Sequence, residues 1–199
     1  MIVKVCGMRE AENAASVLEL GIDMMGFIEY APSPRYAPEP PATEGVARVG
    51  VFVNEKFDTI IECAERAKFS HIQLHGKEST ELCEAIKRRG YGVIKAISVA
   101  TAEDLKACEQ YQQSADILLF DTKCEQHGGS GKRFDWSILE SYSGGLPFLL
   151  SGGIDETMAG EIKTISHPKF IGVDLNSRFE MSAAKKDIEK LRKFINKIR

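Results

Sequence analysis

Short apolar runs recur along the whole chain, and most are continuous rather than alternating with polar residues. A continuous run of strand length is typical of a parallel strand that is buried on both faces. The pattern predicts eight strands, at Ile2–Cys6, Met24–Ile28, Arg48–Val53, Ser70–His75, Gly92–Ile97, Ile117–Phe120, Phe148–Leu150 and Phe170–Val173.

Helical patterns lie between most of these runs. They cover about 9–20, 55–67, 78–89, 101–113, 135–141, 155–165 and 183–197, and Ser182 is the expected N-cap of the last helix. Alternation of strands and helices indicates βα units around a parallel sheet. We therefore expect residues 1–199 to form a single domain, an α/β (β/α)8 TIM barrel.

One connection is too short for a full helix. The segment 37–47 contains three prolines and one glycine, which leave room for about one helical turn. The second helix of the barrel is therefore expected to be shortened.

Composition narrows the classes of partner. The chain carries 26 Lys and Arg against 29 Asp and Glu, a net charge of -3, which argues against nucleic acid or an acidic membrane surface. It contains no apolar run of the ~20 residues that a membrane span needs. The five cysteines form no C-x-x-C pair, so we do not expect a disulfide framework or a thiolate metal site. We expect a cytoplasmic location instead.

Two titratable side chains stand at predicted strand ends, where barrel active sites lie. They are Asp121 and Cys6, and strand parity places Lys4 on the same side as Cys6. A buried Lys4 needs a carboxylate partner, and its field is expected to lower the thiol pKa. The alternatives are a capping role for Asp121 and a small buried apolar cysteine at position 6.

Glycine-rich turns supply candidate anion sites. Gly128–Gly131, which includes Gly129 and Ser130, follows the strand that carries Asp121, and Gly152–Gly153 follows the next one. Unblocked backbone N–H groups in such turns can bind phosphate. The first turn is not a nucleotide P-loop, because Gln126 and Arg133 replace the required glycine and Ser/Thr.

Other polar residues fall at the same expected barrel mouth. Gln73 and His75 share one strand face and can line it as hydrogen-bonding groups. His71 and His75 do not suggest a metal site, because four strand residues span about 13 Å. Arg35 lies in a proline-braced loop and is either a clamp for a carboxylate or an exposed loop arginine.

Taken together, these segments resemble phosphoribosylanthranilate isomerase, a (β/α)8 enzyme family of tryptophan biosynthesis. The matching motifs occur in family order over nearly the whole chain: Lys4–Met8, Gly26–Ile28, Ser33–Tyr36, Val49–Asn54, Ile72–Gly76, Leu119–Thr122, Gly128–Lys132 with Phe134–Trp136, Leu150–Ile154, and Gly172–Ser177 with Glu180.

The resemblance implies an Amadori rearrangement of a phosphorylated small molecule without cofactor or metal. Asp121 would be the general acid and Cys6 the general base. Arg35 would hold the anthranilate carboxylate, while Gln73 and Asp174 would contact the rest of the substrate. The phosphate would be bound by Gly129, Ser130, Gly131, Gly152, Gly153, Asn176, Ser177 and Arg178.

Arg178 departs from the family pattern, which usually has glycine there, and we expect it to add a positive charge for the phosphate.

Two rival functions remain open. One is the related histidine-pathway isomerase or a dual-substrate enzyme, although that isomerase uses two aspartates where this chain has Cys6 and Asp121. The other is a non-catalytic barrel that binds phosphorylated ligands. The sequence does not decide between a monomer and a homodimer.

Overall fold

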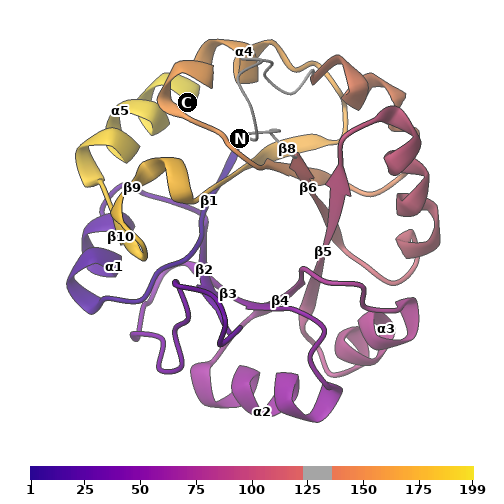
Figure 1. The fold of residues 1–199 in the computed structure, drawn as a ribbon, viewed down its shortest axis with the longest axis horizontal. Coiled ribbons are helices and arrows are strands. Elements are labelled where there is room, and N and C mark those ends of the chain that lie inside the picture. Colours follow the sequence, from indigo (N-terminus) through magenta and orange to yellow (C-terminus); the bar gives the residue numbers. More distant parts are fainter. Residues whose placement is uncertain (123–135) are drawn as a thin grey trace.

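The computed structural model describes residues 1–122 and 136–199, and in them eight parallel strands close a barrel (Figure 1). β1 (Ile2–Val5) pairs with β8 (Phe170–Leu175), which closes the sheet. The other strands follow in chain order: β2 (Met24–Ile28), β3 (Ala47–Phe52), β4 (His71–Leu74), β5 (Gly92–Val99), β6 (Ile117–Thr122) and β7 (Phe148–Ser151). The predicted (β/α)8 barrel is therefore confirmed.

Helices surround the barrel and cover the outer face of the strands (Figure 1). The α-helices are α1 (Ala11–Leu18), α2 (Phe57–Ala67), α3 (Thr80–Arg88), α4 (Ala159–Thr164) and α5 (Ile188–Ile198). Four 3₁₀ helices join them: η1 (Ala102–Tyr111), η2 (Trp136–Ser141), η3 (Glu156–Met158) and η4 (Ser177–Phe179). The patterns at 101–113 and 135–141 thus form 3₁₀ helices in their described residues rather than α-helices.

Two expectations need correction. The described connection between β2 and β3 contains no helix at all, consistent with its prolines, which disfavour helix formation. The last helix begins after Asp187, not after Ser182, because the Asp187 carboxylate accepts a hydrogen bond from Lys190 N at 3.0 Å. The residues before it form a hairpin of β9 (Glu180–Ser182) and β10 (Lys185–Lys186).

The barrel interior changes from apolar to polar along its axis. Its apolar layers are built by buried side chains from alternate strand positions: Met24, Val49, Ile94, Ala96, Leu119 and Leu149. Toward the carboxyl ends of the strands, the buried polar residues Lys4, Gln73 and Asp174 take their place. Buried charges need partners, so this polar layer indicates where chemistry is placed.

Within the described ranges, no helix is long and apolar enough to cross a membrane. The cysteines described there, Cys6, Cys63, Cys83 and Cys108, are all free thiols.

Candidate active site

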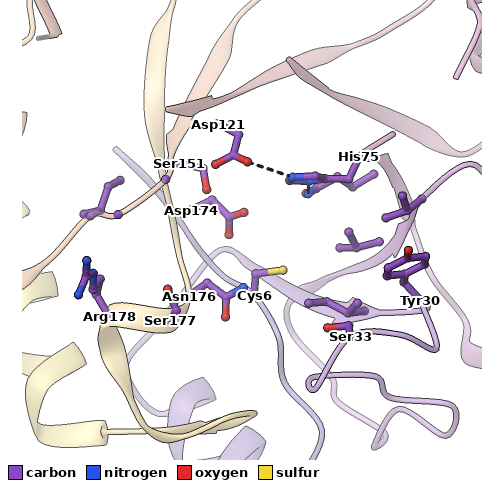
Figure 2. Close-up of a pocket in the computed structure, with 17 residues that line it drawn as sticks. Cys6, Tyr30, Ser33, His75, Asp121, Ser151, Asp174, Asn176, Ser177 and Arg178 are labelled. Carbon is purple, nitrogen blue, oxygen red and sulfur yellow. Dashed lines mark hydrogen bonds and ion pairs between the residues drawn. The ribbon is translucent and has the colours of Figure 1, made fainter. Parts of the chain in front are cut away.

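A cavity of about 650 Å³ opens at the carboxyl ends of the strands (Figure 2). Its walls include Cys6, Gln73, Asp121 and Asp174, which the sequence places on four different strands or just beyond them. The closed barrel brings these ends together, although the residues lie up to 168 positions apart in the chain. The strand-end prediction for Cys6 and Asp121 is therefore confirmed in its geometry.

Cys6 follows β1 directly and is almost completely buried. Lys4 lies beneath it and has the expected carboxylate partner, with its Nζ 2.9 Å from Asp174 Oδ2. Gly26 on β2 leaves the space that both groups need: a Cβ there would lie 2.7 Å from Cys6 Sγ and 3.1 Å from Lys4 Nζ. The thiol and the ammonium are therefore close neighbours.

The expected lowering of the Cys6 pKa is wrong. Burial raises the pKa of the thiol, and although Lys4 and Lys186 oppose this rise, they do not reverse it. Burial is the main cause, and Asp174 adds to it as a nearby negative charge that also pairs with Lys4.

Asp121, on β6, faces the cavity and is joined to β4 through a histidine. His75 Nε2 lies 3.3 Å from Asp121 Oδ2, and His75 Nδ1 lies 2.9 Å from Gln73 Nε2. Figure 2 shows the first of these contacts across the upper part of the cavity. The candidate acid is thus the end of a three-residue hydrogen-bond chain.

One end of the cavity is suited to an anion. Gly152 and Gly153, with φ of 89° and 65°, follow β7 in a backbone conformation that glycine adopts without strain. Asn176, Ser177 and Arg178 continue this wall after β8. Gly129, Ser130 and Gly131, which were predicted to share the anion, lie outside the described residues.

The other end is more apolar. Ile28 and Tyr30 line it at the end of β2, and Val51 and Val53 line it at the end of β3. Apolar walls of this kind suit an aromatic ring. The cavity therefore has a polar centre between an anion end and an apolar end.

Arg35 is not among the residues that line the cavity. Its Nε and Nη2 form a two-pronged ion pair with Glu180 at 2.9 and 2.6 Å. Glu180 Oε1 also accepts a hydrogen bond from the buried Lys186 Nζ at 2.6 Å, and the same ammonium donates to Asn176 Oδ1 at 2.8 Å. One charge network thus connects the Arg35 loop, the hairpin and the anion end.

The network shifts two pKa values in the same direction for different reasons. Burial alone would raise the pKa of the Glu180 carboxyl, but hydrogen bonds from Arg35 and Lys186 hold it below its ordinary value. Burial lowers the pKa of the Lys186 ammonium, and its contact with Glu180 opposes this without cancelling it.

In the part of the chain that the structure describes, no group of three or more His, Cys, Asp or Glu side chains is arranged to hold a metal ion.

Comparison with known proteins decides the family. The family model described as N-(5'phosphoribosyl)anthranilate (PRA) isomerase matches residues 3–197. The chain belongs to this family. The N-(5'-phosphoribosyl)anthranilate isomerase of Parabacteroides distasonis is 47% identical over 206 aligned residues, covering 100% of this chain and 93% of that protein.

Solved structures agree with this assignment. Phosphoribosyl anthranilate isomerase from Thermotoga maritima superimposes with a TM-score of 0.84 at 34% identity, covering 100% of this chain and 98% of that chain. A phosphoribosyl anthranilate isomerase in complex with reduced 1-(o-carboxyphenylamino)-1-deoxyribulose 5-phosphate gives 0.83 at 32% identity, with the same coverage of both chains.

Three residues of this PRA isomerase family member gain importance only in the structure. His75 was expected at the mouth but not as the partner of Asp121, and Glu180 and Lys186 had no expected role. The sequence signal for His75 was the strand face that it shares with Gln73. Nothing in the sequence pattern placed Lys186 inside the protein, because its position fell within the helix predicted at 183–197.

A second buried ion pair supports the segment that carries His75. Lys95 Nζ donates to the carbonyl oxygens of Leu74 and Gly76 at 3.1 and 2.8 Å, on either side of His75. It also lies 3.1 Å from Glu78 Oε2, and Glu78 in turn accepts hydrogen bonds from the Gly76 backbone N–H. Both side chains are buried, so this pair fixes the backbone from which His75 projects.

Proposed function

We propose that this chain catalyses the Amadori rearrangement of N-(5-phosphoribosyl)anthranilate to 1-(2-carboxyphenylamino)-1-deoxyribulose 5-phosphate in tryptophan biosynthesis, as a cytoplasmic single-domain barrel. One observation carries the proposal. Asp121, a carboxyl group, and Cys6, a thiol, line one cavity whose ends suit a phosphate and an aromatic ring. The family membership of the chain supports the same reaction.

The first step needs an acid, and Asp121 is the candidate. Its carboxyl group donates a proton to the ring oxygen of the ribose, and the bond between this oxygen and C1′ breaks. The amine lone pair then forms a C=N double bond, which gives an iminium ion. His75 supports this role because it contacts Asp121 Oδ2 and so orients the carboxyl group.

The second step needs a base, for which we propose the thiolate of Cys6. It removes the C2′ proton, and the electron pair of that bond moves into a C1′=C2′ double bond, returning the iminium electrons to nitrogen. The resulting enolamine loses its hydroxyl proton and gains one at C1′ to become the ketone. Two protons are gained and two are lost, so the reaction is an isomerisation that consumes nothing.

The two ends of the substrate are bound by different chemistry. Gly152, Gly153 and the 176–178 segment are the proposed phosphate site, with Arg178 as its side-chain cation. Arg35 is the proposed partner of the anthranilate carboxylate. Because Glu180 occupies its Nε and Nη2, the N–H groups on the Nη1 side are the ones left to face a ligand.

The proposal is tested by the loss of anthranilate-type fluorescence when purified protein meets freshly prepared phosphoribosylanthranilate. Wild type should accelerate the loss, and Asp121→Asn should abolish the acceleration. Asp58→Asn, which removes an exposed carboxylate on α2, is the matched control and should remain fully active. If the wild type is inactive here but converts the histidine-pathway substrate, the proposed substrate is wrong. Binding without turnover of either substrate would instead support a non-catalytic barrel.

A further inference from the structure

Gln73 carries a buried amide that lines the cavity and contacts His75. The side chain is 1% exposed, and its Nε2 lies 2.9 Å from His75 Nδ1. Its Oε1 is buried and has no hydrogen-bond partner among the described residues. It is unusual for the nitrogen of a buried amide to have a hydrogen-bond partner while its oxygen has none, because leaving a buried acceptor unpaired is unfavourable.

The chemistry of the amide fixes the proton on the histidine. The nitrogen of an amide side chain only donates hydrogen bonds, so His75 Nδ1 must accept. A neutral imidazole that accepts at Nδ1 carries its hydrogen on Nε2. Since Nε2 faces Asp121 Oδ2 at 3.3 Å, His75 donates to that oxygen.

We infer that Gln73 is a positioning residue that determines which oxygen of Asp121 carries the catalytic proton. With Oδ2 accepting from His75, the acidic proton must reside on Oδ1, the oxygen that His75 does not hold. If the amide were reversed, Nδ1 would carry the hydrogen and Nε2 would accept from an Oδ2–H group. The proton would then be held by His75 instead of being available to the substrate.

The unpaired Oε1 connects this arrangement to the ligand. Gln73 and Asp174 both line the cavity, and Asp174 Oδ1 is likewise buried without a described partner. Both oxygens are acceptors, so they suit hydroxyl or amine donors, the groups of a ribose phosphate amine. A hydroxyl that donates to Oε1 holds the amide in the orientation that serves His75. Recognition of that hydroxyl therefore favours the productive proton on Asp121.

The tautomer can be tested without any turnover. The chain has four histidines, and ¹⁵N NMR of the imidazoles at pH 8.5 distinguishes the protonated from the unprotonated ring nitrogen. His75→Asn assigns the signals by deletion, and His71→Gln on the same strand is the matched control that leaves them in place. We expect the Nε2–H form in wild type and the Nδ1–H form in Gln73→Glu, whose carboxylate only accepts. An Nδ1–H form in wild type overturns the inference.

Enzyme kinetics provide a second test of the role of Gln73, and this test rests on the proposed function. Gln73→Leu should lower kcat about tenfold, a part of the ~10²–10⁴ that a general acid contributes. In a His75→Asn background the same change should have no further effect on kcat, because it acts through His75. Additive losses would show a purely structural role and overturn the inference. If no variant turns over the substrate, the proposed function fails, while the NMR result still decides the tautomer.

Discussion

The buried ammonium of Lys186 donates to Asn176 Oδ1 over 2.8 Å, and this contact sets the direction of the amide. With its oxygen facing Lys186, the Asn176 NH₂ group is left to donate elsewhere, and Asn176 lines the anion end of the cavity. Lys186 is itself held in place by Asn13, which bonds to both its backbone N–H and its carbonyl oxygen at 2.7 and 2.9 Å. Lys186, a residue of the hairpin, thus orients the side chain of Asn176, which is proposed to bind the phosphate.

We expect Lys186→Met to raise KM about tenfold, with a smaller effect on kcat, because the amide loses its orientation. Lys185→Met on the same hairpin is the matched control, since Lys185 is exposed and should leave both constants unchanged. Steady-state kinetics with a parallel urea titration separates this effect from misfolding. Equal KM values for wild type and a folded Lys186→Met variant would contradict the role.

The buried thiol predicts the alkaline side of the pH profile. The proposed reaction needs Cys6 deprotonated and Asp121 protonated. As pH rises, more of Cys6 becomes thiolate until the thiol is fully ionised; beyond that pH no further base forms, the acid that the first step needs becomes scarcer, and kcat/KM falls. Because burial raises the Cys6 pKa, this fall should begin above the ordinary thiol value of about 8.5. Initial rates from pH 6 to 10 test this, and a fall that begins below pH 8 would disagree with it.

Arg178 should assist phosphate binding rather than obstruct it. Removing its cation with Arg178→Gly, which restores the usual family residue, should raise KM about tenfold, in line with the ~1.5 kcal/mol of a charged hydrogen bond. Arg178→Lys should retain part of the affinity, because it keeps the charge without the planar fork. Titration with a phosphate-bearing product analogue provides the same comparison at equilibrium. A lower KM for Arg178→Gly would show that arginine crowds the ligand.

The barrel could be predicted because its signal is local. Eight apolar runs of strand length, separated by turn residues, identify parallel strands without knowledge of tertiary contacts. The strand ends then locate Cys6, Asp121 and Gly152 at one mouth. This is why the described strands match their predicted ranges to within two residues.

The charge network could not be predicted in the same way. Its members lie 145 positions apart in the case of Arg35 and Glu180, and no period connects them. Lys186 fell within the helix predicted at 183–197, whereas the structure places it in the hairpin and buries it against Glu180. Because lysine is seldom buried, no local pattern indicates this position. The predicted direction of the Cys6 pKa shift was wrong for a related reason: it depends first on how deeply the barrel buries the thiol, and then on Asp174, a charge that lies outside the first strand.

The close packing of Gly26 against Cys6, the proposed general base, can also be tested. A methyl group added by Gly26→Ala would lie 2.7 Å from Cys6 Sγ, closer than unstrained side chains allow, and would make a tight contact of 3.1 Å with Lys4 Nζ. Cys6 must then move, and we expect kcat/KM to fall at least tenfold while the barrel still folds.

Gly160→Ala is the matched control for this substitution. Gly160 lies in α4, and an added Cβ there meets no atom within 4 Å. Alanine in a helix should therefore leave activity unchanged and raise the free energy of unfolding by about 0.5–1 kcal/mol. Kinetics and urea titration of both variants make the comparison. A fully active Gly26→Ala enzyme would show that the position of Cys6 Sγ is not critical, and it would weaken the case for Cys6 as the base.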